Sequence, residues 1–164
     1  MRSLSVASLL LVAAVASAAD PTPPKGFTAL FNGKDLTGWR GWNIHGKGGS
    51  PVDLAKATPE DAKKLWDEWT ADAKKHWSVK DGVLVNDGNG AYLTTDKEYS
   101  DYELLIEYKT VAKADSGIYL KNTPQVQIWD YTDKGKFNLG SDKGSGGLWN
   151  NAAGNPGKDP LVLA

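Results

Sequence analysis

Hydrophobic and polar side chains alternate in three short runs of the chain: residues 102–109, 117–121 and 125–130. Alternation of this kind places every second side chain on the same face of a β-strand. A short polar link follows the first run, and the turn-forming Asn122-Thr123-Pro124 follows the second. The pattern predicts three neighbouring strands, around which we expect the rest of the chain to be organised.

The predicted strands have one apolar face and one face of mixed polar and aromatic groups. The apolar face carries Tyr102, Leu104, Ile106, Tyr108, Ile118, Leu120, Val126 and Ile128. The other face carries Glu103, Glu107, Tyr119, Lys121, Gln125, Gln127 and Trp129. A half-polar antiparallel sheet is most often simply exposed to solvent. Amides beside flat aromatic rings also suit a carbohydrate-binding surface, so this face is the candidate site.

A helical pattern interrupts the strands at residues 59–75. Thr58 is suited to the N-cap and Pro59 to the first helical position. The apolar side chains at helical spacing are Leu65, Trp66 and Trp69. We therefore predict one helical insert that docks through this stripe at the rim of a sheet.

Short strand and turn signals fill much of the remaining chain. Residues 27–31 alternate as a strand, and Trp39 is expected to pack behind it as a hydrophobic plug. The Gly-rich residues 40–49 predict a loop. Residues 76–85 predict a hairpin that turns at Asp81-Gly82, and residues 91–94 predict another strand.

The first 18 residues have the features of a secretory signal peptide. Arg2 precedes an apolar stretch that is too short to span a bilayer, and Ala16-Ser17-Ala18 forms a small-residue cleavage site. A proline-rich lead-in at residues 19–26 and one domain at residues 27–164 follow. We expect an exported protein, periplasmic or extracellular, without a membrane anchor.

Composition narrows the functional classes. The formal net charge is −1, which suggests neither a nucleic-acid partner nor binding to an anionic membrane. The chain has no Cys, so disulfides and thiolate metal sites are excluded. It has seven Trp and six Tyr, and aromatic side chains with a polar group suit half-wet binding surfaces.

The common catalytic motifs are absent from the sequence. It contains no Gly-x-Ser-x-Gly elbow, phosphate-binding loop or zinc-binding His-Glu-x-x-His. His45 and His76 lack metal-ligand spacing and are expected to be loop or strand-edge residues. Glu103 and Glu107 would lie ~13 Å apart along one strand, which is farther than the two acids of a glycosidase.

Four motifs occur in an order that resembles the secreted 3-keto-disaccharide hydrolase family, also called 3-keto-glucoside lyase/hydratase domains. They lie at residues 27–39, 99–104, 115–121 and 125–130. The resemblance implies an all-β, concanavalin-like jelly-roll sandwich, here with one helical insert. Two positions depart from it: Lys121 replaces a frequent Arg, and Gln125 replaces a frequent Glu. Relatives continue for several more strands, so the sandwich is expected to be incomplete.

The resemblance implies a hydrolase or lyase that acts on sugars oxidised at carbon three. The ketone acidifies the hydrogen on carbon two, so a base can remove it and the glycosidic oxygen can leave by elimination. The site then needs a base and a positive group for the enolate oxygen, either a divalent metal ion or a Lys or Arg.

Lys121 is the candidate for the positive group and Asp130 for the base or metal ligand. Gln125 and Gln127 would bind sugar hydroxyls, and Tyr119 or Trp129 would stack on the ring. The alternative is a non-catalytic, lectin-like module that uses the same face, because fold alone does not define function. The sequence does not specify the metal or the oligomeric state.

Overall fold

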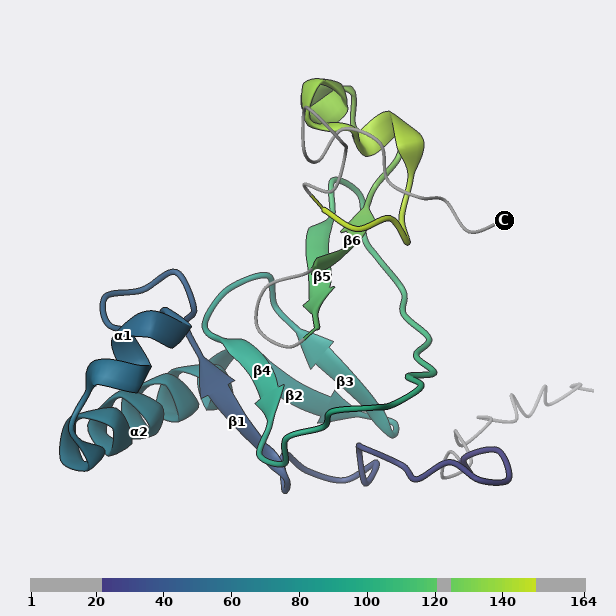
Figure 1. Ribbon diagram of the computed structural model, residues 1–164. Helices are drawn as coiled ribbons and strands as arrows, with labels where there is room; N and C mark the ends of the chain where they lie inside the picture. The colour runs from purple at the N-terminus through teal and green to yellow at the C-terminus, as the bar shows by residue number, and fades with distance from the viewer. Residues whose placement is uncertain (1–21, 121–124, 150–164) are drawn as a thin grey trace, which may run out of the picture. The chain divides into compact units, whose positions relative to one another are not determined.

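The computed structural model describes residues 22–120 and 125–149, and within them the fold is β-rich. These residues form six β-strands, two α-helices and two 3-10 helices. The chain divides into two compact units, Met1–Lys97 and Glu98–Ala164 (Figure 1). The predicted signal peptide lies outside the described residues.

The first unit contains two antiparallel strand pairs. Strand β1 (Trp39–Trp42) pairs with β4 (Tyr92–Thr95), and β2 (Trp77–Lys80) pairs with β3 (Val83–Asn86). The turn between β2 and β3 is formed by Asp81 and Gly82, both with positive φ (51° and 77°). These backbone angles suit a two-residue hairpin turn, so the predicted hairpin is confirmed. The loop predicted at residues 40–49 is wrong at its start, because β1 continues to Trp42.

The predicted helix is confirmed as α2 (Pro59–His76). The Thr58 hydroxyl accepts a hydrogen bond from the Asp61 backbone N–H at 3.2 Å, which satisfies one unpaired N–H of the first turn. A second, unpredicted helix, α1 (Pro51–Lys56), precedes it and is capped in the same way by Ser50. With only six residues and no buried side chain, α1 has too short a pattern to be recognised from periodicity.

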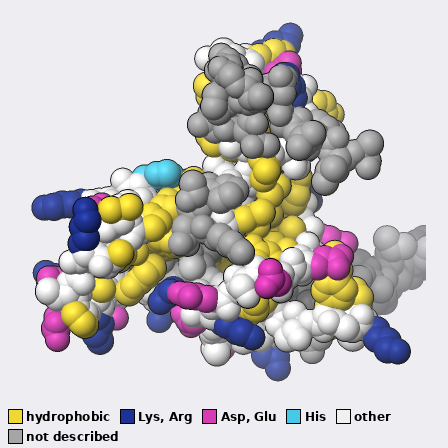
Figure 2. Space-filling model, in the orientation of Figure 1, with side chains coloured by type: hydrophobic (Ala, Val, Ile, Leu, Met, Phe, Trp, Pro, Cys, Tyr) yellow, Lys and Arg dark blue, Asp and Glu magenta, His cyan; other side chains and the backbone are white. Residues whose placement is uncertain are grey.

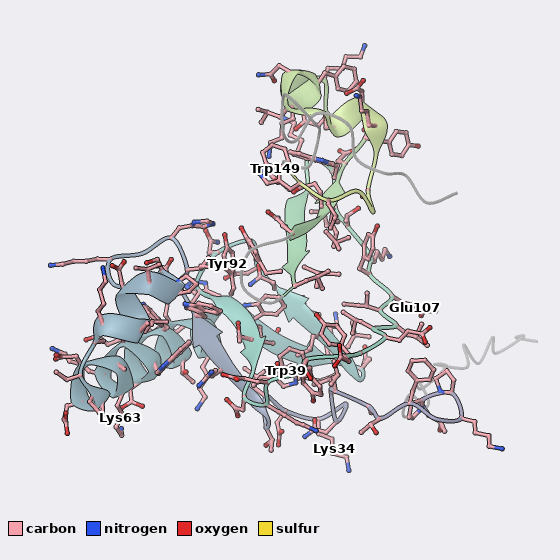
Figure 3. All side chains as sticks on the ribbon, in the orientation of Figure 1. Lys34, Trp39, Lys63, Tyr92, Glu107 and Trp149 are labelled. Carbon is pink, nitrogen blue, oxygen red and sulfur yellow. The ribbon has the colours of Figure 1, made fainter. Side chains whose placement is uncertain are left out.

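The apolar stripe of α2 forms the core of the first unit. Trp69 and Ala73 are buried together with Trp42 from β1 and Ala91, which precedes β4. Trp66 contacts Trp42 and Trp69 edge to face, with ring centroids 5.6 and 5.2 Å apart. On the opposite side of the helix Lys63 extends away from the sheet (Figure 3), and charged side chains surround the helices at the left of Figure 2. The predicted docking face of α2 therefore forms part of the core of the first unit.

The strand predicted at residues 27–31 is wrong. The Phe27 N–H donates to the Pro24 carbonyl at 3.0 Å, which closes a turn instead. Trp39 is half-buried at the start of β1, and its indole N–H donates to the Leu30 carbonyl at 3.1 Å. Trp39 therefore holds the segment around Leu30 against β1 through a hydrogen bond, which the expected role as a plug did not include.

The second unit is built on a hairpin of β5 (Asp115–Tyr119) and β6 (Gln125–Trp129). The predicted run at residues 125–130 is confirmed as β6, and the run at residues 117–121 is confirmed up to Tyr119, where β5 ends. Residues 145–149 add backbone hydrogen bonds along the other edge of β6, and Val126 forms an antiparallel bridge with Leu148. Two 3-10 helices, η1 (Lys134–Leu139) and η2 (Ser141–Lys143), connect β6 to this segment.

The strand predicted at residues 102–109 is wrong. These residues form no ladder with any described part of the chain, and most of their side chains are exposed. Alternation determines which side chains would share a face, but a strand also needs a partner with free backbone groups. The described chain offers this segment no such partner.

The observed strands form three two-stranded sheets, β1–β4, β2–β3 and β5–β6. Among the described residues they do not close into a barrel. The β-rich class is thus confirmed. The jelly-roll arrangement stays a prediction.

Candidate functional site

The predicted polar face exists on the β5–β6 hairpin. Residues directly opposite each other in an antiparallel pair lie on the same face. The opposed pairs on this face are Asp115 with Trp129, Gly117 with Gln127, and Tyr119 with Gln125. The register therefore brings together four predicted substrate-binding residues, Tyr119, Gln125, Gln127 and Trp129, and adds Asp115 to them.

Much of this face is buried, contrary to a simple solvated surface. Gln127 is 3% exposed and Trp129 6%. The backbone of Gln127 bonds on its second edge to Gly146 and Gly147, each at 2.9 Å. On its other edge Gln127 is directly opposite Gly117 of β5. A buried amide in such a position is retained only if its polar atoms find partners.

Asp115 supplies the partner and links Gln127 to a lysine. The Gln127 side-chain amide donates to Asp115 Oδ1 at 3.0 Å. The Lys136 ammonium donates to Asp115 Oδ2 at 2.5 Å. The side chains of Lys136 and Asp115 keep 29% and 44% of their surface exposed, so this ion pair is accessible to a ligand from solvent.

Aromatic rings flank the ion pair. Lys136 Nζ lies 5.7 Å from the Trp129 ring centroid, within range for a cation–π interaction. The Trp149 ring meets Trp129 edge to face at 5.8 Å, and Trp149 is 37% exposed. Figure 3 labels Trp149 close to this hairpin. We name Asp115, Gln127, Trp129, Lys136 and Trp149 the hairpin cluster.

Asp130 follows β6 and has a different environment. Its Oδ2 accepts from the Lys113 backbone N–H at 2.6 Å, and its Oδ1 accepts from the Thr132 N–H and hydroxyl at 2.9 and 2.7 Å. These hydrogen bonds, that of the Thr132 hydroxyl above all, lower the pKa of Asp130 below its usual range. The carboxylate therefore ties two turns together and is a weaker base than a solvated aspartate.

The remaining predicted site residues have separate placements. Lys121 lies outside the described residues. Tyr119 is half-buried at the end of β5. The Gln125 side chain lies across Gly117 and donates weakly to the Ser116 carbonyl at 3.4 Å. It is placed to contact a ligand only if that bond is exchanged.

The described residues do not fit a divalent metal site. Among them, no group of three His, Cys, Asp or Glu side chains is arranged to hold a metal ion. His76 lies between two carboxylates, with its Nδ1 2.9 Å from Asp87 and its Nε2 3.8 Å from Asp72. His45 contacts the Tyr92 ring edge to face at 6.0 Å. No step of the chemistry is therefore assigned to a metal.

The sequence pattern missed Asp115, Lys136 and Trp149. Asp115 has the same strand parity as Tyr119, so extending the alternation two residues backwards would have found it. Lys136 and Trp149 lie in segments with no strand periodicity, and only the folding of 3-10 helix η1 and of residues 145–149 brings them to the face. Together the cluster offers a carboxylate, an ammonium, an amide and two indoles, which is a set that binds polar ligands with flat apolar faces.

The fold and this cluster define a β-rich domain with a patch of charged, amide and indole side chains on a hairpin. A sequence model for the 3-keto-alpha-glucoside-1,2-lyase-like domain matches residues 26–161. The match covers most of the chain, so the chain belongs to this family, whose name describes a carbohydrate-acting enzyme. No curated protein and no solved structure gave a significant match. No helix among the described residues is long and apolar enough to cross a membrane.

Proposed function

We propose that the protein is an exported hydrolase or lyase that cleaves 3-keto-glycosides, with the active site on the polar face of the β5–β6 hairpin. The observation that carries this proposal is the family match over residues 26–161. The hairpin cluster supports it because a carboxylate, an ammonium and the Trp149 ring, all partly exposed, lie together on this face. The complete sandwich of the family, a concanavalin-like jelly roll, is part of the proposal.

The chemistry follows from the ketone at carbon three. A carboxylate takes the proton from carbon two, and the electrons of that C–H bond form an enolate whose charge lies on the ketone oxygen. The enolate then expels the glycosidic oxygen from carbon one, which takes up a proton as it leaves. Water can add afterwards to the double bond between carbons one and two. The net result is elimination or, with water, hydrolysis.

Two carboxylates are available for the proton transfer. Asp130 was the choice from sequence, but its three hydrogen bonds lower its pKa and weaken it as a base. Asp115 lies on the polar face itself, opposite Trp129, and its side chain keeps 44% of its surface exposed. We assign the base to Asp115 in preference to Asp130 because a substrate on this face can reach it.

An ammonium beside the base would stabilise the enolate oxygen. Lys121, the sequence candidate, keeps this role in the proposal. Lys136 is a second candidate, because it lies on the same patch as Asp115. The Trp149 ring and the Gln125 amide would position the sugar, with Tyr119 at the far end of the face, while the buried Gln127 and Trp129 would support the site from below.

The test is turnover of a 3-keto-glucoside together with hydrogen–deuterium exchange at carbon two in D₂O. Asp115→Asn is expected to lower both rates by about 10²–10⁴, as for loss of a general base. Asp142→Asn is the matched control, because Asp142 is an exposed aspartate of the same unit, in η2. Lys121→Met and Lys136→Met are each expected to cost ~10²–10³ if they stabilise the oxyanion.

The outcomes separate the alternatives. If Asp130→Asn rather than Asp115→Asn abolishes turnover while the protein stays folded, the base is Asp130. If the parent does not turn over 3-keto-glucosides but binds unoxidised glycans reversibly, the lectin-like function replaces the enzymatic one. If it does neither, the proposed function is rejected.

A further inference from the structure

Asp130, at the end of β6, is bonded to the chain that leads into β5. Its Oδ2 accepts from the Lys113 backbone N–H at 2.6 Å, and its own N–H donates to the Ala114 carbonyl at 2.9 Å. These two residues directly precede Asp115, the first residue of β5. Asp130 therefore anchors the backbone immediately before Asp115.

The other oxygen of the same carboxylate anchors the segment that carries Lys136. Oδ1 accepts from the Thr132 N–H and hydroxyl at 2.9 and 2.7 Å, and the Asp130 carbonyl accepts from the Asp133 N–H at 3.1 Å. The Asp133 carbonyl in turn accepts from the Lys136 N–H at 3.0 Å, within η1. Asp130 is thus bonded to the backbone beside each member of the Asp115–Lys136 ion pair.

Lys113 has a backbone conformation that needs support from outside its own turn. Its φ is 62°, in the left-handed region that residues other than glycine rarely adopt. It lies in a tight turn, in which the Ala114 N–H donates to the Val111 carbonyl at 3.1 Å. Such backbone outliers persist where the surrounding structure holds them, and they gather at functional sites. The Asp130 carboxylate supplies this support, because its bond to the Lys113 N–H is short and charge-assisted.

We propose that Asp130 is a positioning residue, whose carboxylate holds the turns on both sides of it so that Asp115 and Lys136 meet. The inference rests on the proposed function, in which Asp115 is the base. A misplacement of about 1 Å at such a group can slow a reaction ~10²-fold. A carboxylate is needed at this position because both of its oxygens accept, whereas an amide would turn its own N–H₂ group toward a donor N–H.

The first test needs no substrate and uses NMR spectroscopy of the purified parent protein. The hydrogen bonds to the Asp130 carboxylate lower its pKa below the ordinary value of 3.8. On acidification the Lys113 and Thr132 amide signals should therefore shift together, with one shared midpoint below that value. Separate midpoints for the two amides would overturn the proposal, because the two turns would then not share one carboxylate.

The second test follows the ion pair itself, again without substrate. Proton exchange from the Lys136 side-chain ammonium should be slow while it donates to Asp115. Asp130→Asn should speed this exchange, as Asp115→Asn does, because the two members of the pair lose their common anchor. Asp133→Asn is the matched control: it removes the same charge from the same segment, and Asn caps a helical turn as well as Asp does. The control should leave the exchange rate at the parental value.

Turnover of a 3-keto-glucoside then separates positioning from proton transfer. Asp130→Asn should lower kcat/KM by roughly 10–100-fold. Its pH–rate profile should keep the ascending limb of the parent, because the base is still present. Lys113→Gly should restore part of the lost rate to the Asp130→Asn variant, because glycine adopts a positive φ without help from the carboxylate.

Three outcomes of the variant experiments would overturn the positioning role. One is an unchanged ammonium exchange rate in Asp130→Asn, since the ion pair would then form without this carboxylate. Another is loss of the ascending limb in Asp130→Asn with no recovery from Lys113→Gly, which would make Asp130 the base. The third is an equal effect of Asp133→Asn, which would indicate a general effect of charge in this segment. A parent without turnover would reject the proposed function, whereas the ammonium exchange would still decide whether Asp130 holds the ion pair together.

Discussion

Trp69 is one of the buried side chains that dock α2 in the first unit. It is 8% exposed and lies in the core with Trp42, Ala73 and Ala91. A buried Trp removes about 150–250 Å² from water, which at roughly 25 cal/mol per Å² corresponds to ~4–6 kcal/mol. That figure is an upper bound, because the unfolded chain already buries part of the same surface. Trp69→Ala is therefore expected to lower the free energy of unfolding of this unit by ~3–5 kcal/mol.

The assay is chemical denaturation followed by circular dichroism at 222 nm. Both α-helices belong to the first unit, so this signal reports mainly on that unit. Glu68→Ala is the matched control, because Glu68 is the preceding residue of α2 and is exposed. It should change the free energy by no more than about 0.5 kcal/mol. If Trp69→Ala were as mild as the control, the docking of α2 through its tryptophan stripe would be refuted.

Three further predictions concern local geometry. A Cβ at Gly41 would overlap the Trp69 backbone carbonyl, so Gly41→Ala should lower the free energy of unfolding by about 1–3 kcal/mol by forcing β1 away from α2. At Gly46 the nearest atoms to a Cβ belong to the Asn43 side chain, which can move, so Gly46→Ala should cost less in the same denaturation assay. The hydrogen bond from His76 is the main cause of the lowered pKa of Asp87. The pair therefore adds folding stability that is fully present above the unfolded-state pKa near 3.8 and is lost as the pH falls through the lower folded-state pKa. NMR titration of His76→Gln should show the pKa of Asp87 move back up. Hydrogen bonds from Thr37 and Asn32 lower the pKa of Asp35 to about 2, so Asn32→Ala should raise it, and an unchanged titration curve would contradict the assigned contacts.

The elements that could be predicted from sequence are those with complete local signals. Helix α2 has a cap, a proline at its first position and an apolar stripe, and the β2–β3 hairpin has Asp81-Gly82 at its turn. Strands β5 and β6 alternate and are neighbours in sequence, so their pairing needs only a short connection. In these cases the local chemistry and the tertiary partner agree.

The failures occur where the partner is remote or missing. Residues 27–31 and 102–109 alternate as well as β6 does, but no described strand pairs with either. Alternation alone therefore overpredicted strands. The same limit applies to the site, because Lys136 and Trp149 reach the hairpin cluster from segments without periodicity, and Asp130 resembled a site carboxylate although its oxygens hold two turns.

The burial of Gln127 has a consequence for how the site works. Its amide cannot turn toward a sugar without losing Asp115, because the Nε2 donor is committed to Asp115 Oδ1 at 3.0 Å. A 3% exposed amide that loses its partner carries a cost of about 1–3 kcal/mol. Gln127 is thus better suited to fix the orientation of Asp115 than to bind a hydroxyl directly, which was its expected role. Since Lys136 holds the other oxygen, the carboxylate is oriented from two sides, and a ligand must approach from the exposed side of the Asp115–Lys136 pair.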